Sequence, residues 1–115
     1  MSQAQFPGAL QALHAPIDER IVNLLLAMMP DAWTSMVLEV GPVQARPGAH
    51  LSFPLTICNA EGQEYLQCPP DRLYSLLFEH YDVFEKNAQP WKGLRVTLTW
   101  QQEGPEWRWV ITYSY

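Results

Sequence analysis

The stretch "WKGLRVTLTWQQEGPEWRWVITYSY", from Trp91 to Tyr115, decides the fold. In its first half every second residue is apolar, namely Leu94, Val96, Leu98 and Trp100. Its second half repeats the pattern with larger side chains, namely Trp107, Trp109, Ile111, Tyr113 and Tyr115. A period of two is typical of strands that bury one face, and the intervening "QQEGPE" contains turn-forming residues. The stretch therefore predicts an antiparallel hairpin.

The aromatic residues of the second half have two interpretations. They can form an exposed platform on which nucleic-acid bases stack, or they can be the half-buried face of a strand. A stacking platform has arginines and lysines beside the rings, whereas Arg95 and Arg108 alternate onto the opposite face. We therefore interpret the aromatic set as a core face with cross-strand pairs.

Three segments before this hairpin are predicted to form a meander of strands. They are Ala32–Gly41 ("AWTSMVLEVG"), Ala49–Cys58 ("AHLSFPLTIC") and Glu64–Cys68 ("EYLQC"). The "GPVQARPG" between the first two contains two prolines and two glycines, so it is predicted to be a loop. Pro54 has no N–H to donate, which places the second strand at a sheet edge or gives it a bulge.

A first amphipathic helix is predicted from Pro16 to the helix-ending Pro30, after a loosely ordered lead-in at residues 1–15. Pro16 suits a first helical turn, and Asp18 and Glu19 would then lie where the helix dipole favours negative charge. The apolar positions with helical spacing are Ile17, Ile21, Leu24, Leu25 and Met28.

A second helix is predicted within Pro69–Pro90. Its apolar stripe is Leu73, Leu77, Tyr81 and Phe84, widened by Leu76 and His80. The order of elements predicts an α+β fold in a single domain, 1–115. We expect an antiparallel sheet of about five strands, the meander plus the hairpin, with both helices packed on one face.

The net charge of −5 on 115 residues, with Lys86 and Lys92 as the two lysines, narrows the classes of partner. It argues against binding to nucleic acid or to an anionic membrane surface. It fits docking onto a basic protein instead. The sequence has no apolar run long enough to span a membrane and no basic segment followed by an apolar block at its start, so we expect a cytoplasmic location.

No arrangement of reactive residues is typical of an enzyme. The histidines and cysteines share no metal-ligand spacing, and we expect no metal site and no cofactor; these residues are His14, His50, His80, Cys58 and Cys68. We interpret His80 as a packed or rim histidine and the cysteines as reduced thiols packed as small apolar groups. Phosphate-binding loops and a G-x-S-x-G motif are also missing from the sequence. The chain is therefore expected to be a binding protein.

Three segments, in order, match the pattern of a known family. "IVNLLLAMMPDAW" (Ile21–Trp33) has an amphipathic helix, a proline, an acidic residue and a tryptophan. "LYSLLFEHYDVFEKNAQPW" (Leu73–Trp91) has a Leu and Phe stripe, F-x-x-N and then "PW", and the chain closes with "YSY". From about Ile17 to Tyr115, the chain resembles the YezG-like family of small immunity (antitoxin) proteins from bacterial polymorphic toxin systems.

The resemblance implies a role in interbacterial competition. Such a protein binds a cognate toxin domain in the cytoplasm and neutralises it, most simply by occluding the active-site cleft. The implied toxin is nuclease or nucleotide-directed, has a basic cleft, and is delivered by a contact-dependent or specialised route such as type VI secretion. The positions that match the family pattern are assigned to the fold; they are Trp33, Pro90, Trp91, Tyr113 and Tyr115.

Exposed acids beside aromatic residues are the candidate toxin contacts, and each also fits ordinary solvated surface. They are Glu61, Glu64, Glu79, Asp82, Glu85, Glu103, Glu106 and the potential anchor Trp107. Two other classes of function stay open. One is a secretion chaperone or adaptor for an effector protein. The other is a small-ligand enzyme or carrier, which the scarcity of polar pocket residues disfavours.

Overall fold

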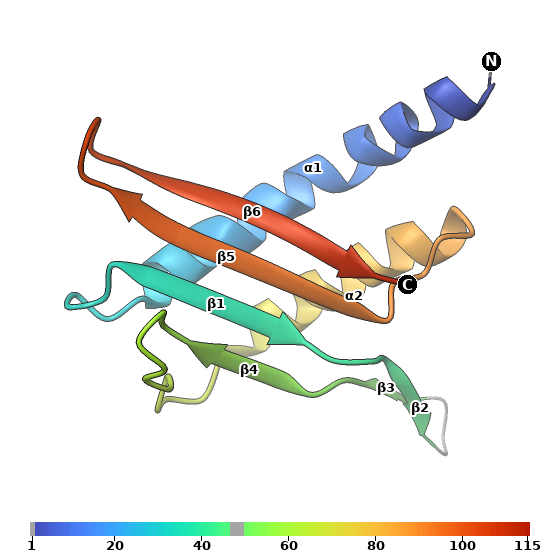
Figure 1. Ribbon diagram of the computed structural model, residues 1–115. Coiled ribbons are helices and arrows are strands. Elements are labelled where there is room, and N and C mark those ends of the chain that lie inside the picture. The colour runs from blue at the N-terminus through green and yellow to red at the C-terminus, as the bar shows by residue number, and fades with distance from the viewer. Residues whose placement is uncertain (1, 47–49) are drawn as a thin grey trace. The chain divides into compact units, whose positions relative to one another are not determined.

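The computed structural model describes residues 2–46 and 50–115 (Figure 1). The chain divides into two compact units that alternate along the sequence. The helical unit consists of Met1–Met28 and Cys68–Pro90, and the sheet unit consists of Met29–Gln67 and Trp91–Tyr115. Because each unit takes two segments, no single cut of the chain separates them.

The helical unit consists of α1 (Ser2–Met28) and α2 (Asp71–Lys86), which contact one another. In α2 the buried residues are Leu73, Leu76, Leu77, His80 and Phe84. They confirm the packing of His80 and the predicted stripe except at Tyr81, which is half-buried. Among the α1 side chains whose burial is described, residues 10–28, the buried ones recur at intervals of three and four; they are Leu10, His14, Ile17, Asp18, Ile21, Val22 and Leu25. No helix in the described part of the chain has the length and apolar character to cross a membrane.

The prediction that the first helix begins at Pro16 is wrong. Helix α1 begins at Ser2 and continues through Pro16, although a proline inside a helix removes one backbone hydrogen bond. The burial of Leu10 and His14 extends the stripe of Ile17 into the preceding turns, and this packing outweighs the cost of the proline. Asp18 is therefore a buried residue in the middle of α1, and the helix N-terminus does not account for its charge.

The sheet unit contains an antiparallel sheet with strand order β4-β1-β5-β6. The strands are β1 (Ser35–Val40), β4 (Leu55–Cys58), β5 (Gly93–Gln101) and β6 (Glu106–Ser114). In the central pair, Met36 lies opposite Leu98 and Leu38 opposite Val96, and all four side chains are 0% exposed. On the other face Arg95 donates hydrogen bonds to the carboxylate of Glu39, and both side chains are exposed.

The predicted α+β class is confirmed, but the sheet has four strands where about five were predicted. "EYLQC" is not a strand, because only Glu64 forms a bridge, to Cys58, and Leu66 is 91% exposed. The placement of both helices on one face of the sheet stays a prediction.

The segment around Pro54 also differs from the predicted single strand. It divides into β3 (His50–Ser52) and β4, and the break includes Pro54. Strand β4 is an edge strand, which is one of the two outcomes predicted from the missing N–H of Pro54. The predicted loop "GPVQARPG" contains β2 (Gln44–Arg46), which pairs with β3 in a separate two-stranded ribbon. Residues 47–48 of the predicted loop and residue 49 of the predicted strand lie outside the described residues.

The aromatic face of β6 is only half covered. The predicted hairpin is confirmed, and Trp109 lies opposite Leu98 and Ile111 opposite Val96. However, β6 is an edge strand, so its side chains have strand neighbours on one side only. Trp109 is consequently 41% exposed although its partner Leu98 is fully buried. Tyr115 is 61% exposed, so the interpretation of the whole set as a core face is wrong at Trp109 and Tyr115.

Gly41 provides a test of the break at Pro54. Its N–H donates to the Pro54 carbonyl (2.9 Å), and a Cβ at this position would lie 2.4 Å from Cγ of the rigid proline ring. We expect Gly41→Ala to lower the free energy of unfolding in urea by about 1–3 kcal/mol, because the added methyl group overpacks the contact.

Gly93→Ala is the matched control. Its added Cβ would lie 2.7 Å from the Ser114 hydroxyl oxygen, which can rotate away. The free energy of unfolding should therefore fall less in Gly93→Ala than in Gly41→Ala. Equal losses in the two variants would contradict this account of Gly41.

Candidate functional site

Acidic side chains gather at one end of the sheet. In the antiparallel order β4-β1-β5-β6, β4 and β5 end where β1 and β6 begin, so the turns that follow β4 and β5 share one end of the sheet (Figure 1, left). We call this region the acidic end and define it by its exposed acids, Asp31, Glu61, Glu64, Glu103 and Glu106. Because β4 and β6 are three strand spacings apart, the acids span roughly 14 Å across the sheet.

Positive charge on the sheet unit lies mostly elsewhere. Lys92 and Arg95 are at the opposite end of β5, where Lys92 N–H bonds the Ser114 carbonyl and Arg95 pairs with Glu39. Arg108, opposite Thr99, is the described base that comes nearest the acidic end. The net charge that the sheet unit places at the acidic end is therefore negative.

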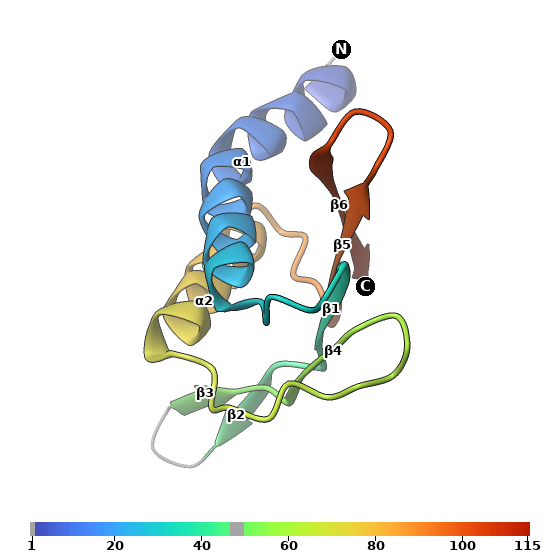
Figure 2. The ribbon, with the colours of Figure 1, turned by 90° about the vertical axis from the view of Figure 1, so that its left-hand side faces the viewer.

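The turn after β4 is held in shape by the side chain of Asn59, which is buried. Its Oδ1 accepts hydrogen bonds from the N–H groups of Glu61 (3.1 Å) and Gln63 (2.8 Å). Ser35 Oγ accepts a further bond from the N–H of Ala60 (2.8 Å), which ties the turn to β1. Asparagine favours such turns because its side chain can replace a backbone acceptor. Glu61 and Glu64 are thus presented on an ordered loop, which Figure 2 shows projecting from the end of β4.

An open groove of about 650 Å³ lies beside this turn. Its lining includes Trp33, Glu64, Tyr65 and Leu66. The rings of Trp33 and Tyr65 pack edge to face with centroids 6.4 Å apart. Leu66 is 91% exposed, so a large apolar side chain faces solvent beside the groove. The acidic end therefore combines negative charge with an apolar anchor point.

The hairpin contributes the other predicted contacts. Glu103 and Glu106 are exposed, while Trp107 is half-buried, packed edge to face on Trp100 with centroids 5.5 Å apart. The structure thus brings together most of the predicted contact residues, namely Glu61, Glu64, Glu103, Glu106 and Trp107.

The remaining predicted contacts, Glu79, Asp82 and Glu85, belong to α2 of the helical unit. All three are exposed, as predicted. Glu79 lies 3.9 Å from Arg20, and Asp82 pairs with Lys86 at 2.9 Å. The hydrogen bond and the charge of Asp82 raise the pKa of Lys86. These pairs leave less unbalanced negative charge on α2 than at the acidic end.

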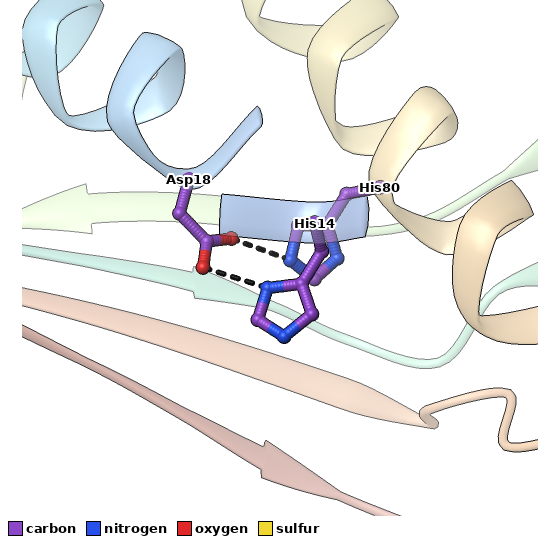
Figure 3. Close-up of side chains that lie close together, drawn as sticks. All are labelled: His14, Asp18 and His80. Carbon is purple, nitrogen blue, oxygen red and sulfur yellow. Dashed lines mark hydrogen bonds and ion pairs between the residues drawn. The ribbon is translucent and has the colours of Figure 1, made fainter. Parts of the chain in front are cut away.

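A second candidate site is buried inside the helical unit. The Asp18 carboxylate lies between two imidazoles, and Figure 3 shows one oxygen directed at each ring. The Nδ1 of His14 is 2.8 Å from Oδ2, and the Nε2 of His80 is 2.7 Å from Oδ1. An ionised carboxylate can only accept, so in that state each of these imidazole nitrogens donates to it. We call His14, Asp18 and His80 the histidine–aspartate cluster.

Apolar packing encloses the histidine–aspartate cluster. Phe84, one turn beyond His80 on α2, stacks on the His80 ring with centroids 4.8 Å apart and contacts the His14 ring at 4.9 Å. The members are 0–6% exposed, so solvent reaches the cluster chiefly beside His14. Such burial suits a polar tie between helices, or an ion site, and leaves little access for a substrate.

Sequence reasoning missed this cluster. The histidines show no metal-ligand spacing in the sequence, but His14 and His80 both contact the Asp18 carboxylate. Two features could have indicated it: His14 and Asp18 are four residues apart on one helical stripe, and His80 lies in the stripe of α2. The proposed helix start at Pro16 hid the first of these by placing His14 outside the helix.

Both cysteines are free, as predicted. Cys58 is half-buried, but Cys68 is exposed, so the interpretation of both as packed thiols is wrong for Cys68. The double proline that follows it, Pro69–Pro70, precedes α2 and keeps this segment outside the helix.

Removal of the Asp18 carboxylate tests the cluster. We expect Asp18→Ala to lower the free energy of unfolding by about 3–5 kcal/mol, because both buried imidazoles lose their acceptor. Asp18→Asn keeps an acceptor oxygen, so its free energy of unfolding should fall by less than that of Asp18→Ala. Urea denaturation followed by circular dichroism measures both.

Glu19→Ala provides the matched control, because Glu19 is the next residue on the same helix and is exposed. The free energy of unfolding of Glu19→Ala should stay within about 0.5 kcal/mol of the wild-type value. If Asp18→Ala were as mild as Glu19→Ala, the cluster would not stabilise the helical unit.

No model of a known protein family matches the chain, and no curated protein matches its sequence. The resemblance to YezG-like proteins therefore stays a prediction from the quoted segments.

Proposed function

We propose that the protein is an immunity protein that binds and neutralises a bacterial toxin domain in the cytoplasm. The observation that supports this proposal best is the acidic end, with its groove and the exposed side chain of Leu66. The proposed partner is a folded protein domain whose surface is basic where the two meet.

Charge and shape favour a protein partner over a small ligand. Acids spread over roughly 14 Å match an extended basic surface better than a single small cation. A large exposed apolar residue such as Leu66 gains free energy when a partner covers it. Trp33 and Tyr65 provide aromatic contact area that loses little conformational entropy on binding.

Neutralisation follows from where such a surface binds. Clefts that hold nucleic acids or nucleotides are basic, because they neutralise phosphate charge. An acidic end that enters such a cleft competes directly with the substrate for the same positive groups. Opposite charge also speeds the encounter, which protects a cell that meets an active toxin. The proposed toxin is therefore nuclease or nucleotide-directed.

The first experiment is co-purification of the tagged full chain from its native host, with identification of every bound protein. The expected result is a stoichiometric, folded toxin domain whose activity disappears on binding. A bound effector that stays active when folded would favour the alternative of a secretion chaperone. Recovery of a small molecule without any protein partner would overturn the proposal.

Removing charges from the acidic end or from α2 tests which of these two acidic surfaces binds the toxin. We expect Glu64→Gln/Glu103→Gln/Glu106→Gln to slow association with the toxin by roughly tenfold at low salt and to weaken the salt dependence of the association rate. Stopped-flow fluorescence measures both quantities.

The matched control removes three charges from α2, in the variant Glu79→Gln/Asp82→Asn/Glu85→Gln. We expect this variant to associate nearly as fast as the wild type. A larger effect of the α2 variant, or an association rate of the wild type that is independent of salt, would exclude docking through the acidic end.

Leu66 tests the apolar anchor. We expect Leu66→Ala to weaken binding about tenfold, as a truncated interface anchor does, while the free energy of unfolding stays unchanged because the side chain is already 91% exposed. Calorimetric titration and urea denaturation measure the two. Leu13→Ala removes another exposed leucine, from α1, and should leave affinity unchanged; equal losses of affinity in both variants would contradict the assignment.

A further inference from the structure

We propose that the histidine–aspartate cluster is a binding site for a divalent transition-metal ion, with Zn²⁺ as its simplest occupant. The proposed ligands are Nδ1 of His14, a carboxylate oxygen of Asp18 and Nε2 of His80. These three atoms lie no farther than 4.8 Å from one another. The site lies within the helical unit, so it is independent of the proposed toxin interface.

The spacing of the ligand atoms is close to that of a metal site. Each imidazole nitrogen lies 2.7–2.8 Å from a carboxylate oxygen. Ligand atoms around zinc lie roughly 3.4 Å apart, when bonds of about 2.1 Å point to the corners of a tetrahedron. Side-chain torsions that move each atom by less than about 1 Å therefore convert the hydrogen-bonded arrangement into a coordination shell. Each imidazole then binds the metal through the nitrogen that faces Asp18, which gives up its proton, and the neutral ring carries its proton on the other nitrogen.

The donor set selects the class of metal. Two imidazoles and one carboxylate suit zinc and its first-row neighbours, whereas calcium and magnesium require a shell of oxygen ligands. Three protein ligands leave a fourth position for water. His14, with 6% of its surface exposed, is the side from which an ion and a water enter.

Electrostatics favours the cation. Among the described residues, the two imidazoles are the only hydrogen-bonding or ion-pair partners of the Asp18 carboxylate. An ionised carboxylate carries a negative charge that is costly in an apolar interior unless a positive charge lies beside it. A divalent cation balances that charge directly. Phe84 holds both rings in place and shields the ion from solvent, as the surroundings of metal sites commonly do.

The test uses the full chain, freed of metal by a chelator and then titrated with ZnCl₂ or CoCl₂. We expect binding of one ion per chain and a rise in the midpoint of thermal unfolding, because the ion binds the folded state. We expect the Co²⁺ complex to show visible absorption typical of nitrogen and oxygen ligands in a tetrahedron. X-ray absorption of the zinc complex should show two imidazole ligands.

Variants separate this site from other metal-binding groups. Asp18→Asn and His80→Gln should each weaken zinc binding by at least roughly 100-fold, since each removes a direct ligand. His14→Gln removes the imidazole at the most exposed side of the cluster. This variant should weaken zinc binding as well. The control Glu19→Gln alters an exposed acid beside Asp18 and should bind like the wild type. All variants are compared in a Cys58→Ser/Cys68→Ser background, so that thiols do not contribute.

Three results would overturn the proposal. The first is the absence of stoichiometric binding of Zn²⁺ or Co²⁺ by the full chain. The second is binding that persists in Asp18→Asn and His80→Gln. The third, which needs no folded variant, is an X-ray absorption spectrum of the zinc complex without imidazole scattering. In each of these cases the cluster is a hydrogen-bonded tie between α1 and α2 only.

Discussion

The pairing of β1 with β5 is the contact on which the rest of the sheet unit depends. It joins segments that α2 separates in the sequence, in a continuous register from Ser35 opposite Thr99 to Val40 opposite Leu94. Because these two strands are central, β4 and β6 become the edges and the turns after β4 and β5 fall at the same end. The gathering of acids at that end therefore follows from topology, since Glu61 and Glu103 are distant in sequence.

In the helical unit a single charge has a comparable role. Asp18 sits in an otherwise largely apolar stripe, and its carboxylate is satisfied only when residue 14 of its own helix and residue 80 of the other are both histidines directed inward. Hydrophobic packing alone tolerates small shifts of one helix along another. A buried carboxylate does not, because a shift leaves it without a donor. The cluster thus specifies one register between α1 and α2.

Local patterns predicted much of this fold. The period of two predicted the C-terminal hairpin and the buried face of β5, and the stripe of α2 was correct except at Tyr81. Pro54 indicated the edge position of β4. The errors arose where tertiary packing overrides local preference. Pro16 has a proline's usual tendency to start a helix, but the buried residues before it extend α1. "EYLQC" alternates like a strand, yet only Glu64 forms a bridge.

The two candidate sites also differ in how much of each could be predicted from the sequence. The exposure of the predicted acids could be read from their neighbours, because charged residues between apolar ones face water. Their gathering could not, since it depends on strand order. The histidine–aspartate cluster required the relative placement of two helices, which no spacing within one helix contains. Its local traces are the interval of four between His14 and Asp18 and the place of His80 in the stripe of α2.

The separation of β1 and β5 in sequence also has a consequence for synthesis. As the chain leaves the ribosome, β1 and β4 emerge first and can pair, but α2 must be translated before β5 is available. During that interval one side of β1 is unpaired, and a two-stranded ribbon is rarely stable by itself. A nascent chain that stalls between Cys58 and Gly93 would therefore display an open strand edge with Met36 and Leu38 uncovered by β5. Such a chain is a ready substrate for chaperones, and the pace of translation through α2 sets how long it stays in that state.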